Sequence, residues 1–373
     1  MNRRLLSLVL AGVLLAGIGV AVLLGRGGSK PGSATGSGPL TTVHGIIGSE
    51  KAPYFADPDV QAAFARHGYR VVVDTAGSRE MVTSTDLSKY DFAFPAGAPQ
   101  GQAIKAAKHA RATYVPFFTP MAVATFTPIV NLLTAAGVAT KDASSGQVVL
   151  DVAKYLALVQ QHKRWSDLQP NTAYNVNKSI LITSTDVRTS NSAAMYLSLS
   201  SYAANNGNIV DSASAADGLL DKLSPLFLEQ GFIASSSEEP FQDYLSIGIG
   251  KDPMVMVYEA QFRGEQIAKD PALTADRVLI YPAPTVFAKH TFVPLTDSGD
   301  QVGRLLTSDP DLRHLAVRFG FRTGDTAYEQ SFAKQRSIPD LPQLIDVVDP
   351  PTFDVLEHMI NAIAVKYQEA KPS

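Results

Sequence analysis

The sequence predicts an α/β protein with a largely parallel sheet, and three observations support this class. Short β-branched or aromatic segments alternate with segments of helical periodicity between residues 43 and 118. Short polar turns join these segments, as they do in βαβ units. The length of 373 residues is enough for two domains of ordinary size and a substantial core.

The first part of the chain contains three predicted strands, and a polar turn follows each of them. The strands are expected at 43–47, 69–74 and 90–94, and the helices at 57–67, from about 78 onward, and at 102–111. Ligands of parallel sheets bind beyond the carboxyl ends of the strands. The turns at 48–51, 77–80 and 95–97 are therefore expected to border a site.

The second part begins and ends with two extended segments, 121–128 and 281–286, which prolines stiffen. Between them, a helix at 219–230 is expected to break at Pro225, and a strand is expected at 253–258. The other predicted helices are 129–136, 300–307, 310–319 and 353–368. The last of these shows a continuous apolar face, which indicates a helix packed on a core.

The stretch 180–206 carries the densest polar turn between a strand and a helix. Ile180–Thr183 is predicted to be a buried strand, and Ala193–Ala204 a helix. The turn between them is rich in hydroxyl side chains and leaves the first N–H groups of the helix uncovered, which suits an anionic or hydrogen-bonding ligand. Alternatively, Thr189, Ser190 or Asn191 only caps the helix.

Composition excludes several classes of function. The net charge is −3 with 18% charged residues, so no basic surplus indicates a nucleic-acid partner. Cysteine is absent, which excludes disulfides, zinc–thiolate sites and thiol nucleophiles. The seven histidines form no HExxH pair, and the chain has no phosphate-binding GxxxxGK[ST] loop. We therefore expect no enzyme activity, no cofactor and no metal.

The N-terminus predicts export from the cytoplasm. Arg3 and Arg4 precede the uncharged run Leu5–Leu24, whose 20 residues are long enough to span a bilayer as a signal anchor. A cleaved export signal is the alternative. Residues up to 41 include a Gly/Ser/Pro-rich segment, which predicts a flexible tether. In both cases the folded part is expected outside the cytoplasm, on a single-pass membrane anchor or secreted.

The order of these parts resembles the type II periplasmic solute-binding proteins of ABC transporters. The turn 185–192 before its helix is similar to a second-lobe loop of the sulfate-, molybdate- and phosphate-type binders, and Gly48-Ser49-Glu50 and Gly77-Ser78 take first-lobe positions. The resemblance covers the chain from Thr42 onward. It implies two lobes joined by two extended crossovers, with residues 42–124 plus 284–373 in lobe 1 and 125–283 in lobe 2.

The resemblance also implies a ligand site between the lobes. The candidate site residues are Ser49, Glu50, Ser78, Arg79, Thr125, Thr189, Ser190, Asn191, Tyr258 and Glu259. Structural roles stay open for them: the hydroxyl residues could cap helices, Arg79 and Lys51 could be surface charges, and Tyr258 could be a core aromatic.

The charged candidates leave two ligand classes open. An oxyanion fits the helix N-terminus, whereas a zwitterion such as an amino acid or peptide could use Arg79 or Lys51 for its carboxylate and Glu259 for its amine. The expected function is capture of a small polar solute for an ABC permease or a membrane sensor. The alternative is a cell-envelope module of the same fold that binds a protein partner.

Overall fold

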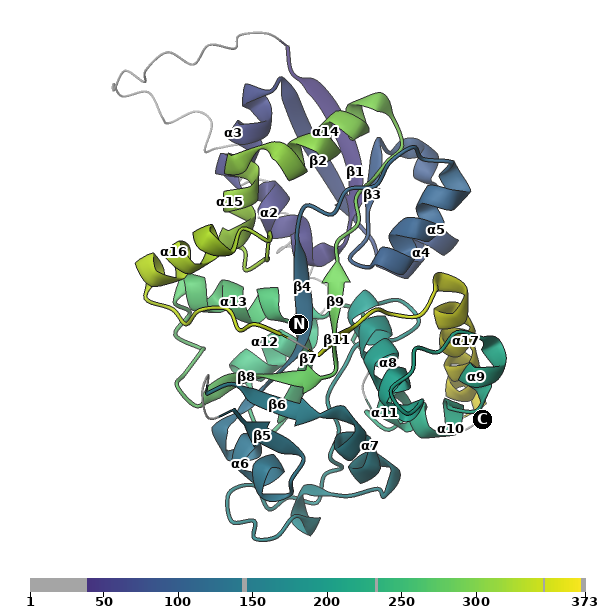
Figure 1. Ribbon diagram of the computed structural model, residues 1–373, viewed down its shortest axis with the longest axis vertical. Helices are drawn as coiled ribbons and strands as arrows, with labels where there is room; N and C mark the ends of the chain where they lie inside the picture. The colour runs from purple at the N-terminus through teal and green to yellow at the C-terminus, as the bar shows by residue number, and fades with distance from the viewer. Residues whose placement is uncertain (1–38, 143–145, 232–233, 345, 370–373) are drawn as a thin grey trace, which may run out of the picture. The chain divides into compact units, whose positions relative to one another are not determined.

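The computed structural model describes residues 39–142, 146–231, 234–344 and 346–369 (Figure 1). The predicted anchor Leu5–Leu24 and most of the tether lie outside these residues. Among the helices of the described part, none is long and apolar enough to cross a membrane. The residues from Leu40 onward form one unit, which is built around two sheets.

The first sheet carries the predicted parallel strands in the order β10-β3-β1-β2. Strands β1 (Thr41–Ile47), β2 (Tyr69–Thr75) and β3 (Phe92–Phe94) are parallel, and β10 (Val293–Pro294) joins β3 antiparallel. One face is covered by α2 (Ala52–Ala56), α3 (Pro58–Arg66), α14 (Asp297–Ser308) and α15 (Pro310–Arg318), and the other by α4 (Ser78–Thr83) and α5 (Ala98–Lys108). We call this sheet with its helices the first region.

The second sheet has the order β11-β9-β4-β8-β6-β5, and β7 also pairs with β4. Its strands are β4 (Phe118–Phe126), β5 (Ala139–Lys141), β6 (Val148–Asp151), β7 (Met254–Tyr258), β8 (Arg277–Ala283), β9 (Thr285–Lys289) and β11 (Val347–Val348). Unlike the first sheet, it is mixed, because β4 pairs antiparallel with β7, β8 and β9. The segment expected to be a simple connection at 121–128 is thus largely a central, buried strand.

Several helices pack on the second sheet, and together they form the second region. The helices between β4 and β8 are α6 (Thr127–Ala135), α7 (Val152–Gln160), α8 (Asn191–Ala204), α9 (Ala213–Asp217), α10 (Leu220–Leu223), α11 (Pro225–Leu228), α12 (Glu238–Ser246) and α13 (Glu259–Ala268). Helix α16 (Thr326–Arg336) follows α15, and single 3-10 turns lie at Ser49–Lys51, Leu87–Lys89 and Trp165–Asp167. The sequence did not predict α12, α13 or α16.

The chain crosses between the regions along β4 and β9, which lie side by side in Figure 1. Phe118–Pro120 pair with Phe287–Lys289, and a bridge between Tyr114 and Phe292 precedes this pairing on the side of the first region. The expected boundaries were Thr125 and Pro284. The chain instead leaves the first region before Thr125, along Phe118–Pro120 of β4, and returns to it after Pro284, along Phe287–Lys289 of β9. Thr125 and Pro284 are both inside the second region.

Two further expectations differ from the structure. Ile180 and Ile182 are buried as predicted, but 180–183 forms only isolated bridges, such as Thr183 with Val255 of β7, and is no regular strand. The C-terminal helix α17 (Phe353–Glu369) has the predicted apolar face, yet it packs on α8, α9 and α10 of the second region and also contacts α5 of the first. This packing differs from the expected grouping of 284–373 as a whole with lobe 1.

Candidate functional site

Two adjoining cavities lie between the first and the second region. Their volumes are about 180 and 860 Å³, and five residues line both of them: Ser49, Glu50, Ser236, Ser237 and Tyr258. Ser49 and Glu50 follow β1, whereas Tyr258 ends β7 of the second sheet. The site thus lies beyond the carboxyl ends of strands from both sheets, where α/β proteins bind ligands.

The smaller cavity is lined mainly by hydroxyl groups and short backbone turns. Its walls are the turn after β1, the turn before α4, the start of α8 and the loop before α12. The hydroxyl-bearing residues in them are Ser49, Thr75, Ser78, Ser190, Ser235, Ser236, Ser237 and Tyr258. Hydroxyl groups both donate and accept hydrogen bonds, so such a cavity suits a polar ligand group.

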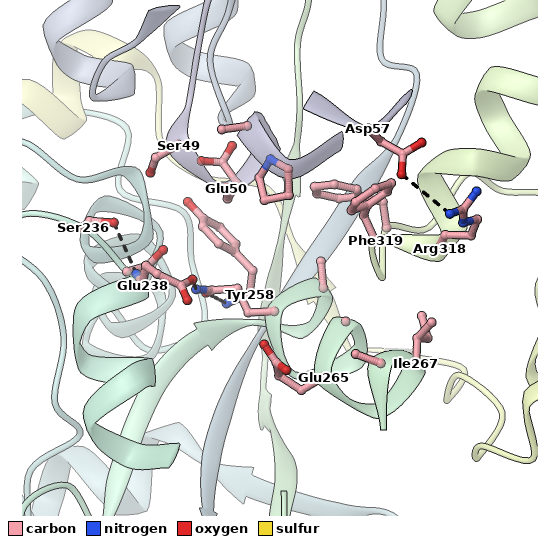
Figure 2. A pocket seen from close by; sticks show the side chains of 18 of the residues that line it. Ser49, Glu50, Asp57, Ser236, Glu238, Tyr258, Glu265, Ile267, Arg318 and Phe319 are labelled. Carbon is pink, nitrogen blue, oxygen red and sulfur yellow. Dashed lines mark hydrogen bonds and ion pairs between the residues drawn. The ribbon is translucent and has the colours of Figure 1, made fainter. Parts of the chain in front are cut away.

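The larger cavity extends along α13 towards α15 and α16, and its lining is more apolar (Figure 2). Phe319, Phe321 and Ile267 contribute apolar surface, while Glu238 and Glu265 contribute carboxylates. The lining also includes Asp57, Arg318 and Arg336, and Arg318 forms ion pairs with Asp57 at 3.6 Å and Asp59 at 2.7 Å. The carboxylates that line this cavity outnumber its cations.

Glu50 is the charged group at the junction of the two cavities, and a buried pair of bases fixes its charge. Burial alone would raise the pKa of Glu50, but the neighbouring Lys51 and His290 outweigh this effect and hold that pKa far below its usual range. Lys51 Nζ donates to Glu50 Oε1 and lies 3.1 Å from His290 Nδ1. Burial lowers the pKa of Lys51, and it lowers the pKa of His290 to about 4. Glu50 is therefore a carboxylate at neutral pH.

Tyr258 and Asn191 form the polar wall opposite Glu50. Figure 2 shows the Tyr258 ring pointing from the end of its strand towards Glu50. Burial raises the pKa of Tyr258, and the charge of Glu50 raises it further, so the phenol stays protonated. Asn191 Nδ2 donates to the Tyr258 hydroxyl at 3.0 Å, while the buried Asn191 Oδ1 has no hydrogen-bond partner among the described residues. A ligand donor could satisfy this acceptor.

Six of the ten residues expected from the sequence meet at this place. Ser49, Glu50, Ser78, Ser190, Asn191 and Tyr258 all line the smaller cavity. Among them, Ser78 has a structural partner as well, because its hydroxyl accepts a hydrogen bond from the Ala96 N–H at 2.9 Å. The rule that polar loops gather at the carboxyl ends of strands thus predicted correctly that these residues lie close together. Their role in binding stays a prediction.

Four expected residues lie elsewhere, each for a physical reason. Thr125 is fully buried inside the second sheet, where its hydroxyl donates to the Pro253 carbonyl oxygen. Glu259 is 1% exposed and accepts hydrogen bonds from Arg322 and Tyr281, so its charge is already compensated. Thr189 turns its carbonyl oxygen towards Gly77 of the first region and lines neither cavity.

Arg79 is the fourth, and its guanidinium group is occupied by protein acceptors. Its Nε lies 2.7 Å from Glu357 Oε1, and its other nitrogens donate to the Arg188 carbonyl oxygen and to Asn361. Lys51 is buried beneath Glu50 and does not face the cavities. Neither basic residue is thus placed to bind a ligand carboxylate, as the zwitterion hypothesis expected.

Sequence reasoning missed the loop before α12 and two acidic residues of the larger cavity, Glu238 of α12 and Glu265 of α13. Three consecutive serines, Ser235–Ser237, precede Glu238, which is a helix-start signal of the kind that was recognised at Ser190 and Asn191. Glu265 carries no such signal, because only the fold places it at the cavity. Burial and the nearby Asp270 raise the pKa of Glu265 to about 7. No group of three or more His, Asp or Glu residues in the described part could hold a metal ion.

Comparison with known proteins places the fold. No family model and no curated protein matches the sequence. The periplasmic binding protein AfuA from Actinobacillus pleuropneumoniae, solved with fructose-6-phosphate, is 11% identical, with 88% of this chain and 99% of that chain covered and a TM-score of 0.53. A periplasmic thiamin binding protein is 12% identical, with 93% and 100% covered and a TM-score of 0.50. An ABC transporter protein from Clostridium perfringens is 11% identical, with 88% and 99% covered and a TM-score of 0.50. The chain has the type II periplasmic-binding-protein fold that its sequence predicted.

Proposed function

We propose that this protein is an extracytoplasmic solute-binding protein, which captures a small organic solute between its two regions. The observation that carries this proposal is the pair of cavities whose walls come from both sheets. A ligand there is fully coordinated only when the regions are together, so binding selects the closed arrangement. An ABC permease or a membrane sensor would then receive the closed, loaded form.

The size of the site supports an organic ligand over a lone oxyanion. Pockets of roughly 300–1,000 Å³ bind drug-sized molecules, and the larger cavity, at about 860 Å³, falls in that range. The smaller cavity suits a polar head group, while Phe319 and Phe321 offer apolar surface to the rest of the molecule.

The charges of the site support a ligand that carries an amino group. Glu50 is ionised at the junction of the cavities, where its ion pair with the buried Lys51 compensates part of its charge, and Glu238 adds a second carboxylate. A carboxylate repels an anion and forms a strong charge-assisted hydrogen bond with an ammonium group. These charges disfavour an oxyanion and favour a solute with an amino group, which would meet Glu50 and Glu238 and not Glu259 as the sequence suggested.

The proposal also includes a membrane tether that holds the folded part outside the cytoplasm. The apolar run Leu5–Leu24 supports a signal anchor that tethers the folded part to the outer face of the cytoplasmic membrane. A tether would hold the loaded protein at a high effective concentration beside its membrane partner.

The first test is native mass spectrometry of the full-length protein in detergent, followed by thermal-shift measurements with amino acids, linear amines, sugars and inorganic oxyanions. A ligand of the closed state raises the melting temperature by mass action. We expect a bound organic molecule, and a shift with an amino compound that is larger than any shift with oxyanions. If no compound gives a shift and a protein partner co-purifies, the protein-binding alternative is correct.

Two neighbouring glutamates provide a matched pair for the charge argument. Glu238 lines the larger cavity, whereas the exposed Glu239 does not. We expect Glu238→Gln to weaken binding of the amino compound about tenfold, as the loss of one charge-assisted hydrogen bond would, and Glu239→Gln to leave it unchanged. Isothermal titration calorimetry measures both. Equal effects of the two substitutions would contradict a specific role for Glu238.

A further inference from the structure

We propose that Arg79 is a clasp that holds the first and the second region together away from the ligand cavities. As regulation of the binding site this inference rests on the proposed function, but the clasp itself does not. Arg79 lies in α4 of the first region, and all three of its acceptors belong to the second region or to α17 packed on it. The acceptors are Glu357 Oε1 at 2.7 Å, the Arg188 carbonyl oxygen at 3.1 Å and Asn361 Oδ1 at 3.1 Å.

The acceptors of the clasp are themselves held firmly in place. Helix α17 is tied to α9 by His358 with Asp217 at 2.7 Å, and to α10 by Lys366 with Asp221 at 2.7 Å. Its apolar face is buried in the core of the second region. On the other side, Arg188 forms two-pronged hydrogen bonds with Asp186. A guanidinium group that meets such fixed acceptors loses less side-chain entropy per bond than an exposed surface pair does.

The backbones beside the clasp approach each other as closely as glycine permits. A Cβ atom on Gly77, two residues before Arg79, would lie 2.5 Å from the Thr189 carbonyl oxygen. At the next turn of the first region, a Cβ atom on Gly97 would lie 2.2 Å from Gln100 Oε1 of the same region and 2.6 Å from the side-chain oxygen Asn191 Oδ1 of the second. The two regions therefore fit together along this edge, and the three bonds of Arg79 form only when they do.

The clasp is separate from the ligand contacts. Arg79, Glu357 and Asn361 are not among the described residues that line either cavity. The side chains of Arg79 and Glu357 are 25% and 15% exposed, so water screens their ion pair only in part. Arg79 accordingly acts as a positioning residue: it shifts the balance between open and closed arrangements and leaves the intrinsic contacts to the ligand unchanged.

The absence of cysteine allows a direct test on the full chain. Spin labels are attached to a variant that carries both Lys108→Cys and Lys222→Cys, which are exposed positions in α5 and α10. Pulsed electron–electron double resonance then measures the distance between the two labels, and so between the regions. The measurement uses dialysed protein in detergent without any ligand. We expect a short distance in the parent chain. In Arg79→Met we expect the ratio of closed to open molecules to fall about tenfold, the effect of one charge-assisted contact.

Two further variants make the result specific. Glu357→Gln should open the protein in the same direction, and the double variant should add little to Arg79→Met, because both substitutions remove one interaction. Glu357→Gln also carries the test if Arg79→Met does not fold. The control is Arg66→Met, which removes an ion pair to Asp311 between α3 and α15 within the first region.

Three results would overturn the clasp: a parent chain that is already open, an unchanged distance in Arg79→Met, or equal opening in Arg66→Met. Because the measurement is made without ligand, it tests whether Arg79 holds the regions together, independently of whether the protein binds a solute. A failure of the proposed function would instead appear as the absence of any bound molecule in native mass spectrometry.

Discussion

At the scale of single residues, the candidate site combines a carboxylate that lines the cavities with buried bases that do not. Glu50 is 10% exposed, whereas Lys51 and His290 are fully buried beneath it. Aromatic rings surround His290, among them Phe117 and Phe321, and its Nε2 atom has no hydrogen-bond partner among the described residues. A buried imidazole without a second partner is costly to protonate.

This environment predicts acid sensitivity that begins before the carboxylates titrate. Burial and the charge of Lys51 lower the pKa of His290 from 6.5 to about 4. Between these two pH values the unfolded chain binds a proton that the folded chain does not, so stability falls as the pH falls from 6.5 to 4. The contribution of His290 to this loss is on the order of 3 kcal/mol. Glu265, whose pKa is raised to about 7, contributes in the opposite direction between pH 7 and 4.5, because the folded chain binds its proton more tightly than the unfolded chain does. Urea unfolding at several pH values measures the net dependence.

The substitution His290→Phe should remove the His290 contribution and keep an aromatic ring there, so between pH 6.5 and 4.5 the variant should lose less stability than the parent as the pH falls. The exposed His162, whose side chain is 72% exposed, is the control, and His162→Asn should keep the slope of the parent protein. Below about pH 4.5 both variants should lose stability, since the lowered pKa of Glu50 adds its own acid sensitivity there. A slope in His290→Phe equal to that of the parent would refute this assignment.

At the scale of secondary-structure elements, the sequence predicted what depends on local pattern. The strands β1, β2 and β3 and the helices α3, α15 and α17 follow from short apolar periodicities, which neighbours in the chain determine. The pairing of β4 with three other strands does not, because its partners lie more than 120 residues away. A central strand and a linker therefore look alike in the sequence when both are apolar and extended.

The same limit separates the predicted site residues that line the cavities from those that do not. Ser49, Ser190 and Asn191 were found because a polar loop after a strand lies at the edge where a sheet binds ligands. Arg79 and Glu259 were assigned to the ligand because a zwitterion needs a cation for its carboxylate and an anion for its amine. Their actual partners, Glu357 and Arg322, are 278 and 63 residues away, and only the folded chain shows them.

The position of α17 gives a prediction at this scale. Met359 is fully buried in the core of the second region, whereas Val365 on the same helix is 53% exposed. We expect Met359→Ala to cost about 2–5 kcal/mol of unfolding free energy, as large-to-small core substitutions do, and Val365→Ala to cost less than about 0.5 kcal/mol. Chemical denaturation measures both. A small loss in Met359→Ala would mean that α17 is not part of that core.

At the scale of the whole folded unit, two cores meet along a line of close contacts. The first sheet and the second sheet each have their own buried cluster, and β4 and β9 join them. Ala260 of α13 belongs to the cluster of the first region and lines the larger cavity, while Gly77, which lines the smaller cavity, comes close to the Thr189 carbonyl oxygen of the second region. Closure thus depends on space between backbones as well as on attraction between side chains.

A side chain placed in that space should keep the regions apart. Gly77 has φ −63°, a conformation that other residues adopt easily, so Gly77→Val introduces no backbone strain of its own. Its Cβ atom would instead meet the Thr189 carbonyl oxygen at 2.5 Å, a contact with backbone that cannot move aside cheaply. Because this contact exists only in the closed arrangement, the substitution should destabilise closure and leave each core intact.

Small-angle X-ray scattering of the full-length protein tests this expectation. Gly77→Val should show a larger radius of gyration than the parent chain, and it should lose the thermal shift that the bound solute gives. Gly250→Val is the matched control, since a Cβ atom there meets nothing within 4 Å. If Gly77→Val stays closed and binds the solute, the backbone at Thr189 can move aside, and the expectation is wrong. Opening of Gly77→Val alone, seen as a larger radius of gyration, would tie closure to the fit between the two regions; loss of the thermal shift without opening would instead show that the valine fills the smaller cavity, which Gly77 also lines.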